Sequence, residues 1–172
     1  MGYEALKDTT SGSRNTAIGT QSAVGVMTGS DNVGVGHETI NAMTSGTRNV
    51  AVGAGALSTT TTGADNVAVG YRALYVGNAS FNTAIGGSAL RSNVTGNGNT
   101  AVGVNAMRNN LTGVSNVAVG ADALFTSTGS SNTAVGNNAL ELATGNYNLA
   151  MGDGAGINQT TGNANTLVGT LS

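Results

Sequence analysis

A short pattern of polar and apolar positions recurs along the whole chain. Asparagine is followed by Thr, Val or Leu, then in most units by Ala, then by Val, Ile or Met, and then by Gly, and the pattern returns at a period of 17 or 16. Self-similarity at a fixed period is the signature of a repeat protein, and ten matches in phase predict about ten stacked units. The asparagines are Asn15, Asn32, Asn49, Asn66, Asn82, Asn99, Asn116, Asn132, Asn148 and Asn165.

Each unit contains two segments that favour short β-strands. In residues 15–19 β-branched side chains alternate with alanine, a pattern typical of a strand. The Ala-Leu pair after the glycine predicts a second strand, and turns containing Gly separate the two. Parallel stacking at about 4.8 Å per coil then predicts an all-β fold. We expect a parallel β-solenoid, or β-roll, of about ten 17-residue coils with two short strands per coil.

Stacking would place equivalent residues directly over one another. The ten asparagines are expected to form a ladder, bonding their own backbone and the asparagines above and below. Val and Leu are expected inside the roll and Ala on the opposite face. One Val and one Leu bury too little apolar area for a coil to fold alone. The small alanines therefore predict that neighbouring subunits approach that face, so the chain should oligomerise.

Composition excludes several classes of protein. Gly accounts for 28 of 172 residues, aromatics for 3% and charged residues for 8%, with no Pro and no Cys. Each Gly in a helix costs about 1 kcal/mol relative to Ala, which excludes helix bundles and coiled coils. No apolar run approaches the roughly 20 residues of a membrane span, so we expect no membrane insertion by this segment.

The charge pattern does not predict a nucleic-acid partner. The formal net charge is −2, and the six Lys and Arg occur singly along the sequence. A nucleic-acid binder needs a basic face to neutralise phosphates. No such face is expected here.

No enzymatic, metal or cofactor site is expected either. His37 is the only histidine and stands beside Glu38, but both occupy variable positions for which no other coil supplies partners. No coil offers a nucleophile beside a base. The acids are isolated and lack the pattern of calcium-binding rolls.

The repeat spans residues 1–172, which predicts one solenoid domain. Near the start, Gly2, Ala5 and Leu6 match the second half of a unit, and at the end residues 169–172 stop at the start of one. Solenoids usually need terminal caps. We therefore expect either a segment of a longer fibre or a subunit whose ends abut other coils.

The motif N-[TV]-A-[VI]-G-x-x-A resembles the head repeats of YadA-like trimeric autotransporter adhesins, in which N-S-V-A-I-G-x-x-S recurs at a somewhat shorter period. It is even more similar to the N-T-A-V-G-x-x-A-L-x-x-x-T-G arrays of bacteriophage tail fibres and related surface fibres. The resemblance covers essentially all of the chain. It implies a left-handed roll, three chains around one axis, an extracellular place on a cell surface or virion, and attachment to a host or surface.

A recognition surface is expected among residues that do not repeat, because the periodic ones hold the stack. Tyr71, Arg72, Tyr75 and Phe81 cluster in sequence around the atypical loop at 77–79. Aromatic faces and Arg suit a host-surface glycan or protein receptor. Local loop packing is the alternative explanation for them.

Two other functions fit the repeat. One is a purely architectural shaft or self-stacking filament that binds nothing. The other is ice binding, because threonine precedes the turn glycine in seven coils. These threonines are Thr28, Thr62, Thr95, Thr112, Thr128, Thr144 and Thr161.

Overall fold

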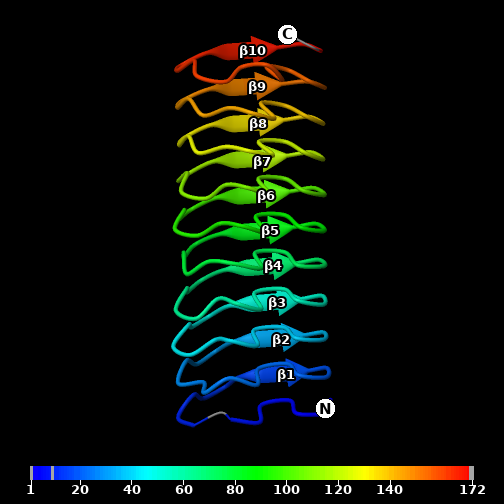
Figure 1. Cartoon of the computed structure of the whole chain (residues 1–172), viewed down its shortest axis with the longest axis vertical. Helices are drawn as coiled ribbons and strands as arrows, with labels where there is room; N and C mark the ends of the chain where they lie inside the picture. Colours follow the sequence, from blue (N-terminus) through cyan, green and yellow to red (C-terminus); the bar gives the residue numbers. More distant parts are fainter. Residues whose placement is uncertain (1, 9, 171–172) are drawn as a thin grey trace.

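Ten short strands stack into one parallel sheet along a rod (Figure 1). The computed structural model describes residues 2–8 and 10–170, and no helix occurs among them. The strands are β1 (Thr16–Ile18), β2 (Val33–Val35), β3 (Val50–Val52), β4 (Val67–Val69), β5 (Thr83–Ile85), β6 (Thr100–Val102), β7 (Val117–Val119), β8 (Thr133–Val135), β9 (Leu149–Met151) and β10 (Thr166–Val168). Their spatial order is their order in sequence.

The strand register repeats the sequence motif without a shift. Ala101 of β6 pairs with Ala118 of β7, its equivalent one full-length repeat further on. Ala118 pairs with Ala134 of β8 across one of the shorter repeats, so the shorter coil loses its residue outside the sheet. The predicted parallel β-solenoid is confirmed.

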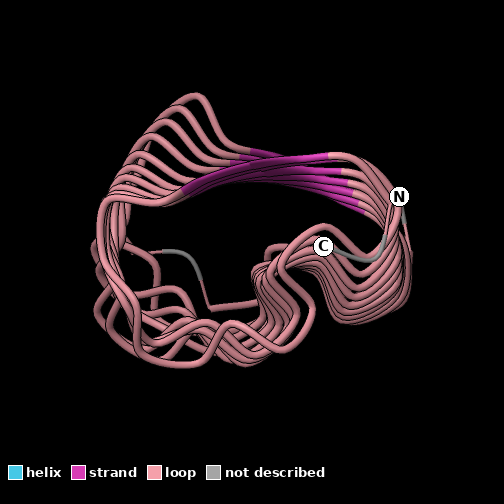
Figure 2. Cartoon of the chain, turned by 90° about the horizontal axis from the view of Figure 1, so that it is seen from above, coloured by secondary structure: helices cyan, strands magenta, loops and turns pink. Residues whose placement is uncertain are grey.

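The prediction of two strands per coil is wrong, because no coil among the described residues contains more than one. The Ala-Leu segment is a turn in which the leucine adopts a left-handed backbone, as at Leu74 (φ 45°) and Leu90 (φ 48°). Backbone hydrogen bonds still join this segment to the next coil, for example from Leu74 N–H to the Ala89 carbonyl at 2.9 Å. A left-handed leucine is costly, and full burial of its side chain offsets that cost. Seen from above, the strands occupy one side of each coil and turns close the rest (Figure 2).

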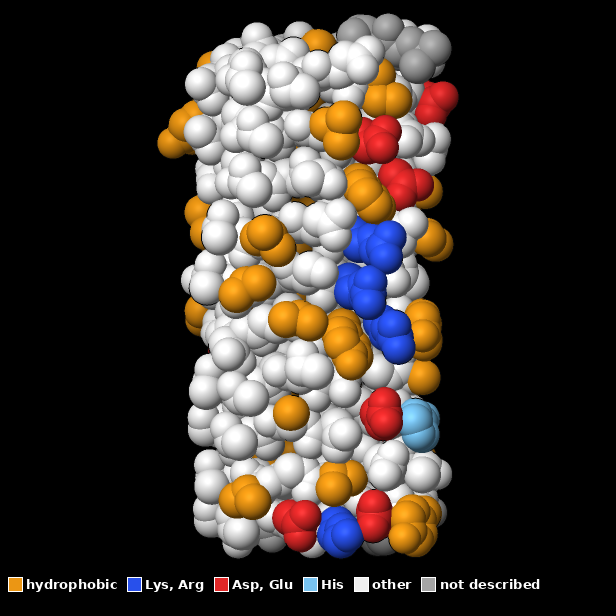
Figure 3. All heavy atoms as spheres, in the orientation of Figure 1, with side chains coloured by type: hydrophobic (Ala, Val, Ile, Leu, Met, Phe, Trp, Pro, Cys, Tyr) orange, Lys and Arg blue, Asp and Glu red, His pale blue; other side chains and the backbone are white. Residues whose placement is uncertain are grey.

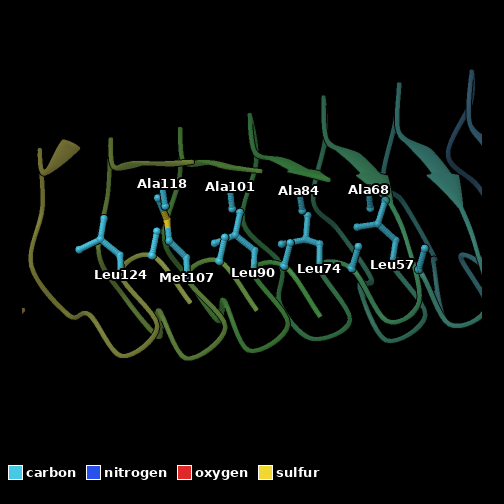
Figure 4. Close-up of a cluster of buried hydrophobic side chains, with 14 of the residues drawn as sticks. Leu57, Ala68, Leu74, Ala84, Leu90, Ala101, Met107, Ala118 and Leu124 are labelled. Carbon is cyan, nitrogen blue, oxygen red and sulfur yellow. The ribbon is translucent and has the colours of Figure 1, made fainter. Parts of the chain in front are cut away.

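The predicted inside and outside of the strand are reversed. The central alanines are buried and meet the leucines within the coil, as Ala84 and Leu74 show in Figure 4. The flanking Val, Ile and Thr face outward. Alanine faces inward because the interior of a coil has room only for a small side chain. At Gly34, which replaces the alanine in its coil, an added Cβ would lie 2.9 Å from the side chains of Ile40 and Thr39. The alanines are therefore small because of the chain's own core, and the inference of a neighbouring subunit at that face is wrong.

The first and third residues of the strands form what we call the outer sheet face. Its third positions are aliphatic in every strand. Several are well exposed, including Ile18 at 53%, Ile85 at 41% and Met151 at 45%. The chain thus presents a continuous ribbon of β-branched and aliphatic side chains along the rod.

The glycine after each strand is required by the stack. Gly103 has φ 141°, a conformation that L side chains rarely adopt. An added Cβ would lie 2.3 Å from the carbonyl oxygen of Gly120 in the next coil. This glycine lets successive coils approach closely where the chain leaves the sheet for the turn that follows each strand.

Candidate recognition site

The ten repeat asparagines lie in one file inside the rod. The Oδ1 atom of each accepts the backbone N–H of the asparagine one coil further on, at 2.9 to 3.0 Å in all nine steps. In most coils Nδ2 donates to the carbonyl of the turn glycine, as from Asn99 to Gly113 at 2.9 Å. Asn82 differs, because its Nδ2 donates to Ser80. Buried amides with partners on both sides make this file a structural element, since unpaired ones would be costly.

Three of the four candidate recognition residues lie together. The Arg72 guanidinium carbon is 5.1 Å from the ring centre of Tyr71 and 5.3 Å from that of Tyr75. Gly55, one coil before, leaves room for the side chains of Arg72 and Tyr75. A Cβ at this position would lie 3.2 Å from Arg72 Cγ. Cation–π contacts of this kind hold an arginine in a defined orientation.

The fourth candidate, Phe81, belongs to a different part of the coil. It directly precedes Asn82 and β5, whereas Tyr71 and Tyr75 follow β4. Its backbone N–H donates to the Ala64 carbonyl at 3.0 Å, and its side chain is 67% exposed. Closeness in sequence therefore did not place it beside the other aromatics.

Two more arginines belong to a file of stacked residues that the sequence analysis did not predict. The residues that directly follow the buried leucine position lie over one another in successive coils. Backbone hydrogen bonds of 2.9 Å join these segments. They run from Val76 N–H to the Arg91 carbonyl, from Ser92 N–H to the Arg108 carbonyl, and from Asn109 N–H to the Phe125 carbonyl. From coil to coil this file runs through Ser58, Tyr75, Arg91, Arg108, Phe125 and Glu141, and we call it the arginine file. Arg108 lies over the Phe125 ring at 5.7 Å. The separation of Arg91 and Arg108 by one whole repeat was the available signal.

The remaining cations are paired with acids. Lys7 pairs with Glu4 at 2.7 Å, Arg48 with Asp65 at 2.6 Å, and Arg14 with Asp31. Hydrogen bonds from Arg14 and Arg48 lower the pKa of the Asp31 and Asp65 carboxyls. Residues 14, 31, 48 and 65 stand in one file before the asparagines, so charge alternates there from coil to coil.

No cofactor-binding geometry occurs in the part of the chain that the structure describes. His37 Nδ1 lies 3.9 Å from Glu38 Oε2, with both side chains about half exposed. Within residues 2–8 and 10–170 no three His, Cys, Asp or Glu gather in a group that could hold a metal, and no pocket is present. Nor do these residues form a helix that could cross a membrane.

No protein-family model, curated protein or solved structure matches the chain.

Proposed function

We propose that the chain is the structural and adhesive module of a trimeric extracellular fibre, carried by a virion or a bacterial surface, and that it mediates attachment to a host or surface. The observation that carries the proposal is the exposed outer sheet face on a rod whose own core is already filled. Soluble monomers rarely leave a continuous apolar surface uncovered.

Further copies of the same chain are the occupants that fit this face. Every coil offers the same two outward positions at the same spacing, so a parallel copy meets matching side chains along the whole rod. Packing of outer sheet faces would bury Ile18, Ile85 and Met151 together with their equivalents. The resemblance to trimeric fibre repeats supports three chains.

Attachment would use the side chains outside the sheet. The asparagine file and the core make the rod rigid, while the turns before and after each strand vary from coil to coil. Variable turns on a rigid scaffold are where binding residues are usually found. Tyr71, Arg72 and Tyr75 lie in such a turn.

Light scattering on the purified chain tests the trimer. We expect three chains per particle for the parent. A triple variant of the outer sheet face, Val52→Lys, Ile85→Lys and Val119→Lys, should be monomeric, because buried like charges would oppose association. One chain per particle for the parent at every concentration would contradict the trimer.

A matched control changes three apolar side chains that are exposed outside the sheet. Val94, Leu111 and Leu142 are each 45% exposed. Their triple replacement by Lys should leave the particle mass unchanged. Loss of association in both triple variants would show that added charge, rather than the sheet face, is responsible.

Retention of the chain on host-cell surfaces tests the attachment role. The adhesive module should be retained specifically, and retention should be lost after competition with the free chain. A chain that is trimeric but retained nowhere would be an architectural shaft.

A further inference from the structure

Three arginines in successive coils form no ion pair with any described carboxylate. Arg72, Arg91 and Arg108 account for half of the six Lys and Arg in a chain of net charge −2, and the other three are each paired with an acid. Figure 3 shows a contiguous patch of Lys and Arg side chains midway along the rod, at the height of the coils that contain these residues. The cations of this chain are thus of two kinds, paired and unpaired.

Two acids in the coils that follow Arg108 accept hydrogen bonds from asparagines. Asp122 Oδ1 accepts a hydrogen bond from Asn105 Nδ2 at 3.1 Å. Glu141 Oε2 accepts one from Asn138 Nδ2 at 2.9 Å. Among the described residues, neither acid forms an ion pair with Arg108. Within residues 2–8 and 10–170, the arginine patch is therefore not neutralised through any ion pair.

Arg91 and Arg108 occupy the same position in consecutive coils. Equivalent positions in parallel strands or turns lie about 4.8 Å apart, so two positive charges follow one another along the rod. In the file at residues 14, 31, 48 and 65, by contrast, Arg alternates with Asp, so no two like charges occupy consecutive coils. Like charges at this spacing repel, and an external anion would relieve the repulsion.

Aromatic rings hold two of the three guanidinium groups in place. Arg72 lies over Tyr71 and Tyr75, and Arg108 lies over Phe125. The Arg108 Nε atom is buried and has no hydrogen-bond partner. Orientation by stacking leaves the other guanidinium N–H groups free to form paired hydrogen bonds to a planar or tetrahedral anion.

We propose that Arg72, Arg91 and Arg108, with Tyr71, Tyr75 and Phe125, bind a linear polysaccharide that carries carboxylate or sulfate groups. A polymer with regularly spaced anions fits charges that are spaced along a rigid rod. Tyrosine hydroxyls beside the arginines suit the hydroxyls of a sugar chain. The inference rests on the proposed attachment function and names the ligand class of that surface.

A nucleic acid fits this surface less well. Single strands bind through aromatic faces on which the bases stack. Here the guanidinium groups lie over the rings of Tyr71, Tyr75 and Phe125. The sequence pI of about 5.0 also lies far below that of nucleic-acid-binding domains.

The test compares two triple variants that lower the net charge by the same amount. One is Arg72→Gln, Arg91→Gln and Arg108→Gln, and the other replaces the paired cations as Lys7→Gln, Arg14→Gln and Arg48→Gln. Binding to immobilised heparin, hyaluronate, neutral dextran and oligothymidine is measured at low and high salt. Heparin and hyaluronate separate sulfate from carboxylate recognition.

The parent should bind heparin or hyaluronate and not dextran, and binding should weaken with salt. Affinity should fall about tenfold for each unpaired arginine removed, because hydrogen bonds to charged groups are strong. The variant of the paired cations should bind like the parent. Equal losses in both variants, or no preference for acidic polymers over dextran, would overturn the inference.

Two further outcomes are diagnostic. Tighter binding to oligothymidine than to either acidic polysaccharide would overturn the proposed ligand class. A parent that is trimeric and retained on cells, yet indifferent to acidic polymers, would overturn the inference while the attachment function stands.

Discussion

The backbone N–H of Asn116 donates to Oδ1 of Asn99, one coil earlier, at 2.9 Å. The same Oδ1 also accepts Asn116 Nδ2 at 3.2 Å, and Asn99 Nδ2 donates to Gly113. One side chain thus joins two coils and fixes a turn. Each coil therefore depends on its neighbours through a buried amide.

Replacing Asn99 by Ala should strongly destabilise the protein. The change leaves the buried N–H of Asn116 without a partner and removes one of the two hydrogen bonds to the Gly113 carbonyl, which we expect to lower the free energy of unfolding by about 2–4 kcal/mol. Urea denaturation measures it. The control is Asn137→Ala, on an exposed turn, which should change stability by no more than about 0.5 kcal/mol. Equal effects of the two changes would contradict a structural role for the file.

Replacing Ala101 by Val should also destabilise, although Val has the higher strand propensity. Ala101 is fully buried, and overpacking a filled core costs about 1–3 kcal/mol. The control is Thr100→Val, which faces outward on the same strand and should be near neutral. Thermal unfolding of both variants checks the expectation. A stabilising Ala101→Val would mean that the interior has room to spare.

Replacing Ser127 by Ala should be neutral or stabilising. The Ser127 hydroxyl is buried and has no hydrogen-bond partner, and Ala143 occupies the equivalent place in the next coil. Removing an unpaired buried polar group should raise the free energy of unfolding by up to about 1 kcal/mol. Asn110→Ala is the contrasting variant, because that side chain donates to Asn93 and to Gly113. It should destabilise in the same denaturation experiment.

The ion pairs of Arg14 and Arg48 should make stability depend on acid pH. Because these arginines lower the pKa of Asp31 and Asp65, the stabilisation is present above the unfolded carboxyl pKa of 3.8. It is lost as the pH falls through the lower folded pKa. The variant Arg14→Gln with Arg48→Gln should melt slightly below the parent at neutral pH.

The two melting temperatures should converge when both aspartates are protonated. High salt should narrow the gap at neutral pH, because the pairs are exposed. A difference that stays constant from neutral to strongly acidic pH would argue against the ion pairs as its source.

Much of the stack could be predicted from spacing alone. A motif that repeats in phase puts each strand over the last, and Ala101 pairs with Ala118 as the repeat requires. Period-2 alternation also separates Ala101 from Val102 onto opposite faces. It does not say which face is inside, because both are apolar; that depends on how much room Leu90 and its neighbours leave in a narrow coil.

The turn at the leucine could not be predicted. Leucine disfavours a left-handed backbone, so nothing in its identity indicates φ 48° at Leu90. Only closure of the coil, with the leucine directed into the core, requires that conformation.

The candidate surface could be predicted only in part. Tyr71, Arg72 and Tyr75 are close in sequence and in space. Arg91 and Arg108 are distant from that turn in sequence. Their place beside it follows only from the repeat, because each occupies the position of Tyr75 in a later coil. Phe81 shows the converse, since a few residues along a coil carry the chain to another side of the rod.

Because the register of the strands is unshifted, the length of the rod is proportional to its number of repeats. Each repeat adds one fixed rise, whether it is of the longer or the shorter kind, because the difference is taken up in the turns. The distance between two surface groups is therefore encoded by the number of repeats that separate them. Inserting or deleting a whole repeat would change that distance by the rise of one coil and leave the strand pairing of the other coils unchanged.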